Sequence, residues 1–304
     1  MTTDHLQYTQ SVSKTFMAIV ILKLYEQGKI KLDDPITKYL PEKHSRYIKN
    51  AKDITVKMLL NHQSGVAEYN SNPAYVADFL MNPGKVTKPE RALTFLENEP
   101  PQFAPGAQYR YTNTNYLLLA LMADAIIGDH AAFIEKNIFQ PLGMKNSFYR
   151  SSKGYLSYER LPDSYWDMLN ELKPVNITTI QRTNVASMIG DDGIVLTPED
   201  AVIFFKGLLD GKLLSESSMK LMQAWVNNKD GKPTYGMGLI HFDLGGIEGI
   251  GHGGGGIGAG CMLLYVPGKK TYIFLATNLG VVIGGPMPEK VGAARDEILA
   301  AILQ

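Results

Sequence analysis

One segment constrains the fold more than any other: from Phe16 to Leu24 every residue except Lys23 is apolar. A surface helix carries an apolar stripe on one side, whereas a helix that is apolar nearly all round must be buried on most sides. We therefore predict a core helix that begins at Ser11 and ends before Gly28. The segment is far too short to span a bilayer, which takes about 20 consecutive apolar residues.

The overall composition narrows the choice of partners. The 304 residues are enough to bury a sizeable core in one large domain or two coupled ones. Thirty basic and thirty acidic side chains cancel, and no run of Lys or Arg stands out, which argues against nucleic acid or an anionic membrane as a partner. Cys261 is the only cysteine, so an internal disulfide is excluded and a cysteine-based metal site is disfavoured.

The hydrophobic pattern changes along the chain. Residues 36–149 show helical patterns and loops, including a strongly apolar helix over 116–127, and residues 150–192 are rich in loop signals. Past Gly231, β-rich runs over 235–242, 260–266 and 271–277 are followed by an amphipathic helix over 288–303. We predict an α+β fold, with a sheet domain (1–40 and 185–304), a mainly helical domain (41–184) and the functional site between them.

Ser11 and Lys14 form the first candidate catalytic pair. A spacing of three residues places both side chains on one face of a helix, and the helix N-terminus favours a developing oxyanion. Burial penalises the charged form of an amine, so a lysine in an apolar setting can accept a serine proton. The other interpretation is a helix with a serine cap and a solvated lysine. Ser217 and Lys220 repeat the spacing, but their segment is polar, and we interpret that copy as a solvated helix start.

Two further motifs carry polar groups that could act with this pair. Tyr111 and Asn113 form the only Tyr-x-Asn of the chain, between a turn and the apolar helix. The phenol could move protons if cations favour its phenolate, although a loop tyrosine packed under the helix explains it equally well. His252 opens a glycine-rich stretch that could expose backbone N–H groups to a substrate, or could be a flexible hairpin loop. As a catalytic residue, His252 could hold a substrate carboxylate or support the Tyr111 phenol.

The remaining candidates have structural interpretations. His62 and Ser64 lie in a loop that ends a helix, and the chain has no G-x-S-x-G motif. Asp191 and Asp192 adjoin glycines, a pattern more typical of a solvated turn than of a metal site. Cys261 lies in an apolar strand and is expected in the core. We expect no metal ion and no cofactor.

The order Ser-x-x-Lys, Tyr-x-Asn, His-Gly-Gly resembles the serine β-lactamase and penicillin-binding superfamily, in the branch of class C β-lactamases, DD-peptidases and related esterases. Further segments are similar to landmarks of that family, at 32–35, 39–41, 59–65, 103–106, 141–144 and 235–238. The resemblance covers most of the chain and implies a β-lactamase-like fold.

The resemblance also implies roles for the candidate residues. Ser11 would attack an acyl carbon to form an acyl-enzyme, while Lys14 and Tyr111 share the proton transfers in an order that stays open. Asn113 would contact the substrate or Lys14. His252 would stand where class C β-lactamases have a lysine.

The glycines after His252 would bind the substrate. Gly253, Gly254 and Gly255 would lie along it, and the backbone N–H groups of Ser11 and Gly255 would form the oxyanion hole. His-Gly-Gly is more typical of peptidase and esterase members, so the expected substrates are small esters, amides or D-amino acid peptides, with β-lactams hydrolysed weakly.

The start of the chain departs from the family pattern. Members usually carry several tens of residues before the nucleophile, forming a helix and two strands, whereas Ser11 follows only ten residues. We therefore expect these N-terminal strands to be missing: the chain is a truncated product, or its sheet is smaller, or another chain covers the exposed edge. An uncovered edge strand invites association, so we expect either a homodimer through this edge or a marginally stable protein. The resemblance suggests a periplasmic or secreted protein, but no signal peptide precedes the first motif, so the compartment stays open. A penicillin-binding sensor without turnover and an inactive pseudoenzyme are the alternatives to an enzyme.

Overall fold

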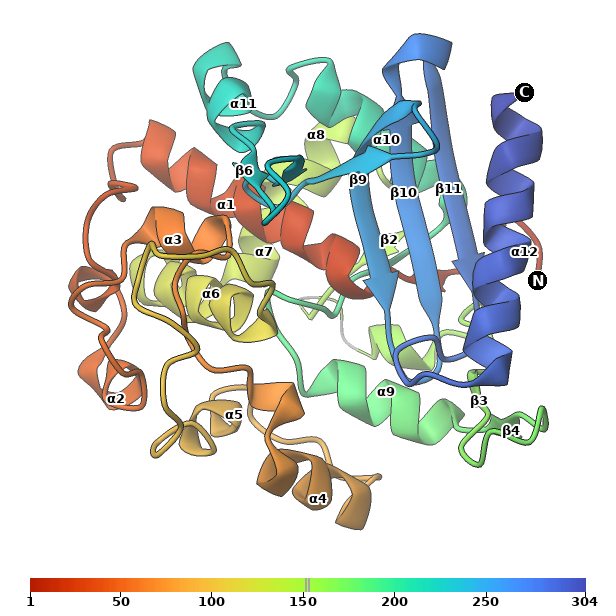
Figure 1. Cartoon of the computed structure of the whole chain (residues 1–304), viewed down its shortest axis with the longest axis horizontal. Helices are drawn as coiled ribbons and strands as arrows, with labels where there is room; N and C mark the ends of the chain where they lie inside the picture. The colour runs from red at the N-terminus through yellow and green to blue at the C-terminus, as the bar shows by residue number, and fades with distance from the viewer. Residues whose placement is uncertain (151, 153) are drawn as a thin grey trace.

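A six-stranded antiparallel sheet forms one side of the molecule in the computed structural model, which describes residues 1–150, 152 and 154–304 (Figure 1). Its strand order is β11-β10-β9-β8-β7-β6. The strands are β6 (Val226–Asn227), β7 (Pro233–Tyr235), β8 (Ile240–Asp243), β9 (Glu248–Gly255), β10 (Gly260–Val266) and β11 (Thr271–Thr277). The predicted α+β fold with an antiparallel sheet flanked by helices is confirmed.

Alternation along β10 gives the sheet two apolar faces. Met262, Leu264 and Val266 pack against Leu299 and Leu303 of α12 (Pro286–Leu303), while Leu263 belongs to the main core on the opposite face. Side chains of a strand point alternately to the two faces of its sheet, so a strand with helices on both sides is apolar at nearly every position. Figure 1 shows α12 alongside β10 and β11.

The main core is built around α1 (Ser13–Glu26), which the sequence predicts as a buried helix. Eleven residues of α1 are buried, and the helix packs against α6 (Asn113–Ile127), α7 (His130–Ile134) and α11 (Glu216–Met222). Gly28 follows its end with φ +70°, a left-handed conformation that suits glycine at a helix terminus. The core that contains α1 also includes side chains of α6, α10 (Pro198–Leu209) and β10. The division into a sheet domain and a helical domain stays a prediction.

The other elements surround this core. The remaining helices are α2 (Glu42–Ser45), α3 (Val56–Leu60), α4 (Pro73–Met81), α5 (Arg91–Thr94), α8 (Gln140–Leu142) and α9 (Thr178–Ala186). A small sheet joins β1 (Gln7–Tyr8), β5 (Val195–Leu196) and β2 (Ser147–Phe148), and a hairpin joins β3 (Tyr165–Trp166) to β4 (Val175–Asn176). Residues 150–192 therefore contain a helix and a hairpin that the loop-rich interpretation missed.

The predicted strand over 235–242 is wrong in one respect, because it is two strands, β7 and β8, joined by a tight turn. Gly238 in that turn has φ +76°, and a Cβ there would lie 2.6 Å from the Cβ of Ala18. Its carbonyl accepts a hydrogen bond from Thr15 Oγ1 at 2.7 Å. The turn therefore packs directly on α1, and only glycine fits the contact.

Within the described residues no single helix is long and apolar enough to cross a bilayer, and only Asn113–Ile127 taken together with His130–Leu142, at an angle of 86°, reaches that length and composition.

Candidate active site

Lys14 connects the candidate residues of three distant segments. Its side chain is fully buried, and Nζ donates to Ser11 Oγ at 2.9 Å, to Asn113 Oδ1 at 2.7 Å and to the Asp191 carbonyl at 3.1 Å. The Ser11–Lys14 pair predicted from the helix spacing thus forms, with Lys14 in the buried setting expected for it.

Hydrogen bonds of Thr9 and Ser13, on either side of Ser11 in the chain, fix the backbone around it. Ser11 lies in the 3₁₀ turn η1 (Gln10–Val12), where Gln10 adopts φ +47°, a left-handed conformation rare for residues with a side chain. The Thr9 and Ser13 hydroxyls are 2.8 Å apart, and Thr9 Oγ1 donates to the Ile194 carbonyl at 2.8 Å. Backbone geometry at the serine is therefore tied to Ile194, the residue before β5.

Tyr111 lies beside the same pair. Lys14 Nζ is 5.1 Å from the centre of the Tyr111 ring. Burial raises the pKa of the Tyr111 phenol, while the positive charge of Lys14 and hydrogen bonds from Lys14 and Ser11 oppose that shift. The neighbouring His62 ring, 4.4 Å away, accepts a hydrogen bond from the Thr112 N–H through Nδ1 at 3.2 Å, in keeping with its structural interpretation.

Asn113 is the first residue of α6, and its two ends make different contacts. Its side-chain oxygen accepts from Lys14, and its backbone N–H donates to Glu68 Oε2 at 2.5 Å. A carboxylate at a helix N-terminus is stabilised by the free N–H groups and the helix dipole. Burial nevertheless raises the pKa of Glu68, against the effect of these hydrogen bonds. Sequence reasoning missed Glu68, which belongs to no motif.

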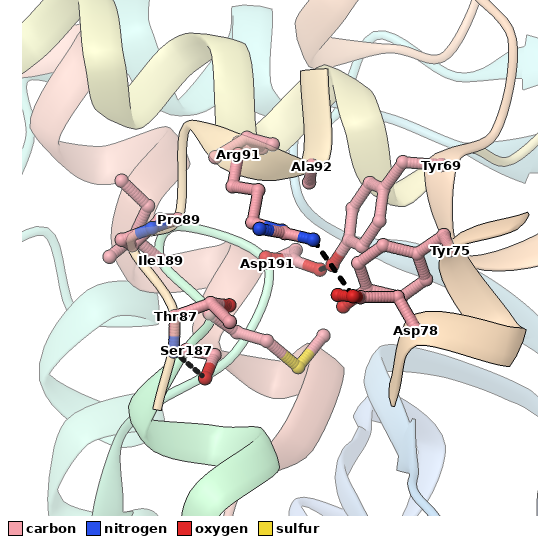
Figure 2. A pocket seen from close by; sticks show the side chains of 12 residues that line it. Tyr69, Tyr75, Asp78, Thr87, Pro89, Arg91, Ala92, Ser187, Ile189 and Asp191 are labelled. Atoms are coloured by element: carbon pink, nitrogen blue, oxygen red, sulfur yellow. Dashed lines mark hydrogen bonds and ion pairs between the residues drawn. The ribbon is translucent and has the colours of Figure 1, made fainter. Parts of the chain in front are cut away.

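The solvated-turn interpretation of Asp191 and Asp192 is wrong, because both are buried, with exposed fractions of 1% and 4%. Tyr69 donates its hydroxyl to Asp191 Oδ2 at 2.8 Å. Figure 2 shows the Asp191 carboxyl group beside Tyr69 in a small cavity, near the ion pair that Arg91 forms with Asp78. The Asp191 carbonyl thus accepts from Lys14, while the Asp191 carboxyl group is bound by Tyr69.

Burial and the neighbouring Asp191 raise the pKa of the Asp192 carboxyl to about 7. In the unfolded chain this group ionises near its ordinary value of 3.8, so raising the pH from 4 to 7 removes stability from the native protein. Asp192→Asn lacks this titration and keeps an oxygen that can accept from the Gly193 N–H. The free energy of unfolding of the variant, taken relative to that of the wild type, should rise by about 2–4 kcal/mol from pH 4 to pH 7. Above that range the difference should level off. Urea unfolding at several pH values measures this, and a pH-independent difference would contradict it.

His252 is buried close to Tyr111. Its exposed fraction is 1%, Nε2 accepts from the Tyr235 hydroxyl at 3.0 Å, and Nδ1 donates to the Gly253 carbonyl at 2.6 Å. Burial lowers the pKa of its imidazole to about 3, so the ring is neutral at pH 7. The ring centres of His252 and Tyr111 are 6.1 Å apart. Both ring nitrogens thus bond within the protein, and a direct contact of His252 with substrate stays a prediction.

One cleft of about 630 Å³ is lined, among others, by Ser11, Tyr111, Asn113, Gly253 and Gly255, whereas Lys14 and His252 are buried behind this lining. Gly254 faces the other side of β9, because a Cβ there would lie 2.4 Å from the Thr9 carbonyl oxygen. Of the three predicted glycines, two therefore line the cleft.

The second Ser-x-x-Lys copy lies outside this cleft. Ser217 and Lys220 lie on α11, where Lys220 pairs with Glu216 at 2.7 Å, and neither is among the described residues that line the cleft. In the part of the chain that the structure describes, no group of three or more His, Cys, Asp or Glu side chains is arranged to hold a metal ion.

Comparison with known proteins agrees with this architecture. A sequence profile of the Beta-lactamase family matches residues 1–287. The putative penicillin-binding protein PbpX of Bacillus subtilis is 28% identical, and the match covers 76% of this chain and 52% of PbpX. The D-aminopeptidase of Brucella anthropi is 26% identical over 95% of this chain and 55% of its own length. This chain thus spans little more than half of either relative.

The fold recurs in a solved structure of similar size. A D-stereospecific amidohydrolase from Streptomyces sp. superposes with a TM-score of 0.81 at 26% identity, covering 91% of this chain and 83% of that one. The match over residues 1–287 shows that the chain belongs to the Beta-lactamase family, and this likeness in fold agrees with it.

Proposed function

We propose that the protein hydrolyses small esters, amides or D-amino acid peptides through an acyl-enzyme on Ser11. The observation that carries the proposal is the 2.9 Å hydrogen bond between Lys14 Nζ and Ser11 Oγ at the base of the cleft. The relatives named D-aminopeptidase and D-stereospecific amidohydrolase support amides of D-configured residues as one substrate class.

The reaction divides into two acyl transfers. Ser11 Oγ attacks the acyl carbon as its proton passes to Lys14 or Tyr111, and the tetrahedral intermediate collapses when the leaving group takes a proton. Water then attacks the acyl-enzyme, and Ser11 leaves with its proton restored. The backbone N–H groups of Ser11 and Gly255 would stabilise the oxyanion in both steps.

The proposal is tested by detecting the acyl adduct on Ser11. Incubation with p-nitrophenyl acetate should release p-nitrophenol continuously, and acid quenching should trap an acetyl group that maps by mass spectrometry to the peptide carrying Ser11. A stable adduct without continued release would instead support the penicillin-binding sensor. No adduct and no release would support the pseudoenzyme. An adduct on the Ser217 peptide would contradict the assignment of the nucleophile.

Self-association through the sheet edge remains a proposal as well. β11 is one of the two outer strands of the large sheet in the described residues, β6 being the other, and the helix α12 packs against the sheet through Leu299 and Leu303. An unpaired outer strand can pair with that of a second chain. Sedimentation should then show a dimer, and a monomer at all concentrations would contradict the proposal.

A further inference from the structure

Exposed apolar side chains gather around the cleft. Of the fourteen large apolar side chains that are exposed among the described residues, ten lie in three short segments, 76–86, 168–175 and 282–283. Four of them line the cleft itself, with exposed fractions of 37%, 52%, 54% and 44%: Val76, Leu80, Val282 and Ile283. We call these four residues the apolar rim. Clustered apolar exposure at a cavity indicates a binding surface more than a folding requirement.

One half of the rim belongs to α4, a helix anchored by polar contacts at its start. No residue of α4 is buried. Asn72 caps the helix by accepting from the Ala74 N–H at 2.9 Å, and Arg91 pairs with Asp78 at 2.8 Å (Figure 2). These contacts hold the helix in place without burying Val76 or Leu80 in the core.

The other half of the rim adjoins the predicted oxyanion hole. Val282 Cγ1 lies 3.0 Å from the position that a Cβ on Gly255 would occupy. The loop that carries Val282 is tied to β3, since the Tyr165 N–H donates to the Asn278 carbonyl at 2.9 Å and the Gly280 N–H to the Tyr165 carbonyl at 2.8 Å. An acyl group whose carbonyl binds at Gly255 would therefore contact Val282.

The charge of the cleft narrows the substrate further. Among the described residues that line it, the acidic ones are Asp191 and Asp192, and no Lys or Arg is present. An anionic acyl group would meet no counter-ion on this lining, whereas an apolar one would cover the rim.

We infer that the acyl donor carries an extended apolar acyl group, such as a chain of about six to eight carbons, which lies on the apolar rim. The inference rests on the proposed function, because it assigns the substrate class of the same site. Full burial of one methylene group is worth about fourfold in binding, and on a half-exposed rim we expect about twofold. From acetate to octanoate, six methylene groups should therefore raise kcat/KM by about 30- to 100-fold.

The experiment compares p-nitrophenyl acetate, butyrate, hexanoate and octanoate below the concentrations at which the longer esters aggregate. The wild type should show the rise, and the double variant Leu80→Ser/Val282→Ser should reduce the octanoate-to-acetate ratio of kcat/KM by about tenfold. Met81→Ser is the matched control, because Met81 is 81% exposed next to Leu80 and does not line the cleft. Its ratio should equal that of the wild type.

The outcomes separate this inference from the proposed function. Ester turnover with a flat or falling chain-length profile would overturn the inference and leave the proposed function standing. An unchanged ratio in the double variant, with altered sedimentation, would make a second copy of the chain the occupant and would also overturn it. No hydrolysis of any ester, together with no adduct on Ser11, would overturn both.

Discussion

Replacing Ser11 with alanine is expected to lower kcat/KM for p-nitrophenyl acetate by about 10⁴-fold or more, because loss of a nucleophile removes the covalent route entirely. The hydroxyls nearest to Ser11 along the chain are engaged elsewhere. The Thr9 and Ser13 hydroxyls bond to each other, and Thr9 also donates to the Ile194 carbonyl. Steady-state kinetics measure the loss, and the melting temperature should change little, since one hydrogen bond contributes about 1 kcal/mol.

The matched control for this prediction is Ser217→Ala. Ser217 has the same Ser-x-x-Lys spacing but lies on α11, where its hydroxyl is 3.0 Å from that of Ser215. Its replacement should leave kcat/KM within twofold of the wild type. Turnover that survives in Ser11→Ala and disappears in Ser217→Ala would make Ser217 the nucleophile in place of Ser11.

Local pattern was sufficient to predict the elements whose environment is uniform along their length. The apolar run after Ser11 predicts a buried helix, and α1 is buried at nearly every position. The runs over 260–266 and 271–277 coincide with β10 and β11, because both strands pack between helices and turns at either end are marked by glycine or proline. Confirmed elements are thus those in which packing against neighbours on both faces produces a continuous apolar signal.

Prediction failed where burial is supplied by distant segments. Asp191 and Asp192 look like a solvated turn in sequence, yet both are buried, and Tyr69 and Lys14, from other parts of the chain, donate to Asp191. Glu68 has no local signal because its partner is the first N–H of a helix 45 residues later. Polar groups buried in a network reveal themselves only through their partners, and sequence spacing does not give those partners.

Lys14 is the residue on which that network depends. Its positive charge lowers the pKa values of Glu68, Asp191, Asp192 and Tyr111, against the desolvation that raises them. Three buried carboxyl groups and a phenol are therefore placed around a single cation. Removing that cation should affect chemistry and stability together, whereas removing a residue that acts only on the substrate should affect chemistry alone.

Lys14→Met should lower kcat/KM for p-nitrophenyl acetate by about 10³-fold, in the range typical of a lost general base or acid. It should also destabilise the fold by about 1–3 kcal/mol, because Asn113 Oδ1 and the Asp191 carbonyl lose their shared donor. Without the cation the pKa of Tyr111 rises, so the remaining activity should appear only at higher pH. Lys14→Arg keeps the charge and should recover stability but not turnover, and Lys220→Met on α11 is the surface control. Activity retained in Lys14→Met but lost in Tyr111→Phe would make Tyr111 the group that deprotonates Ser11, since a buried phenolate would then suffice without the amine.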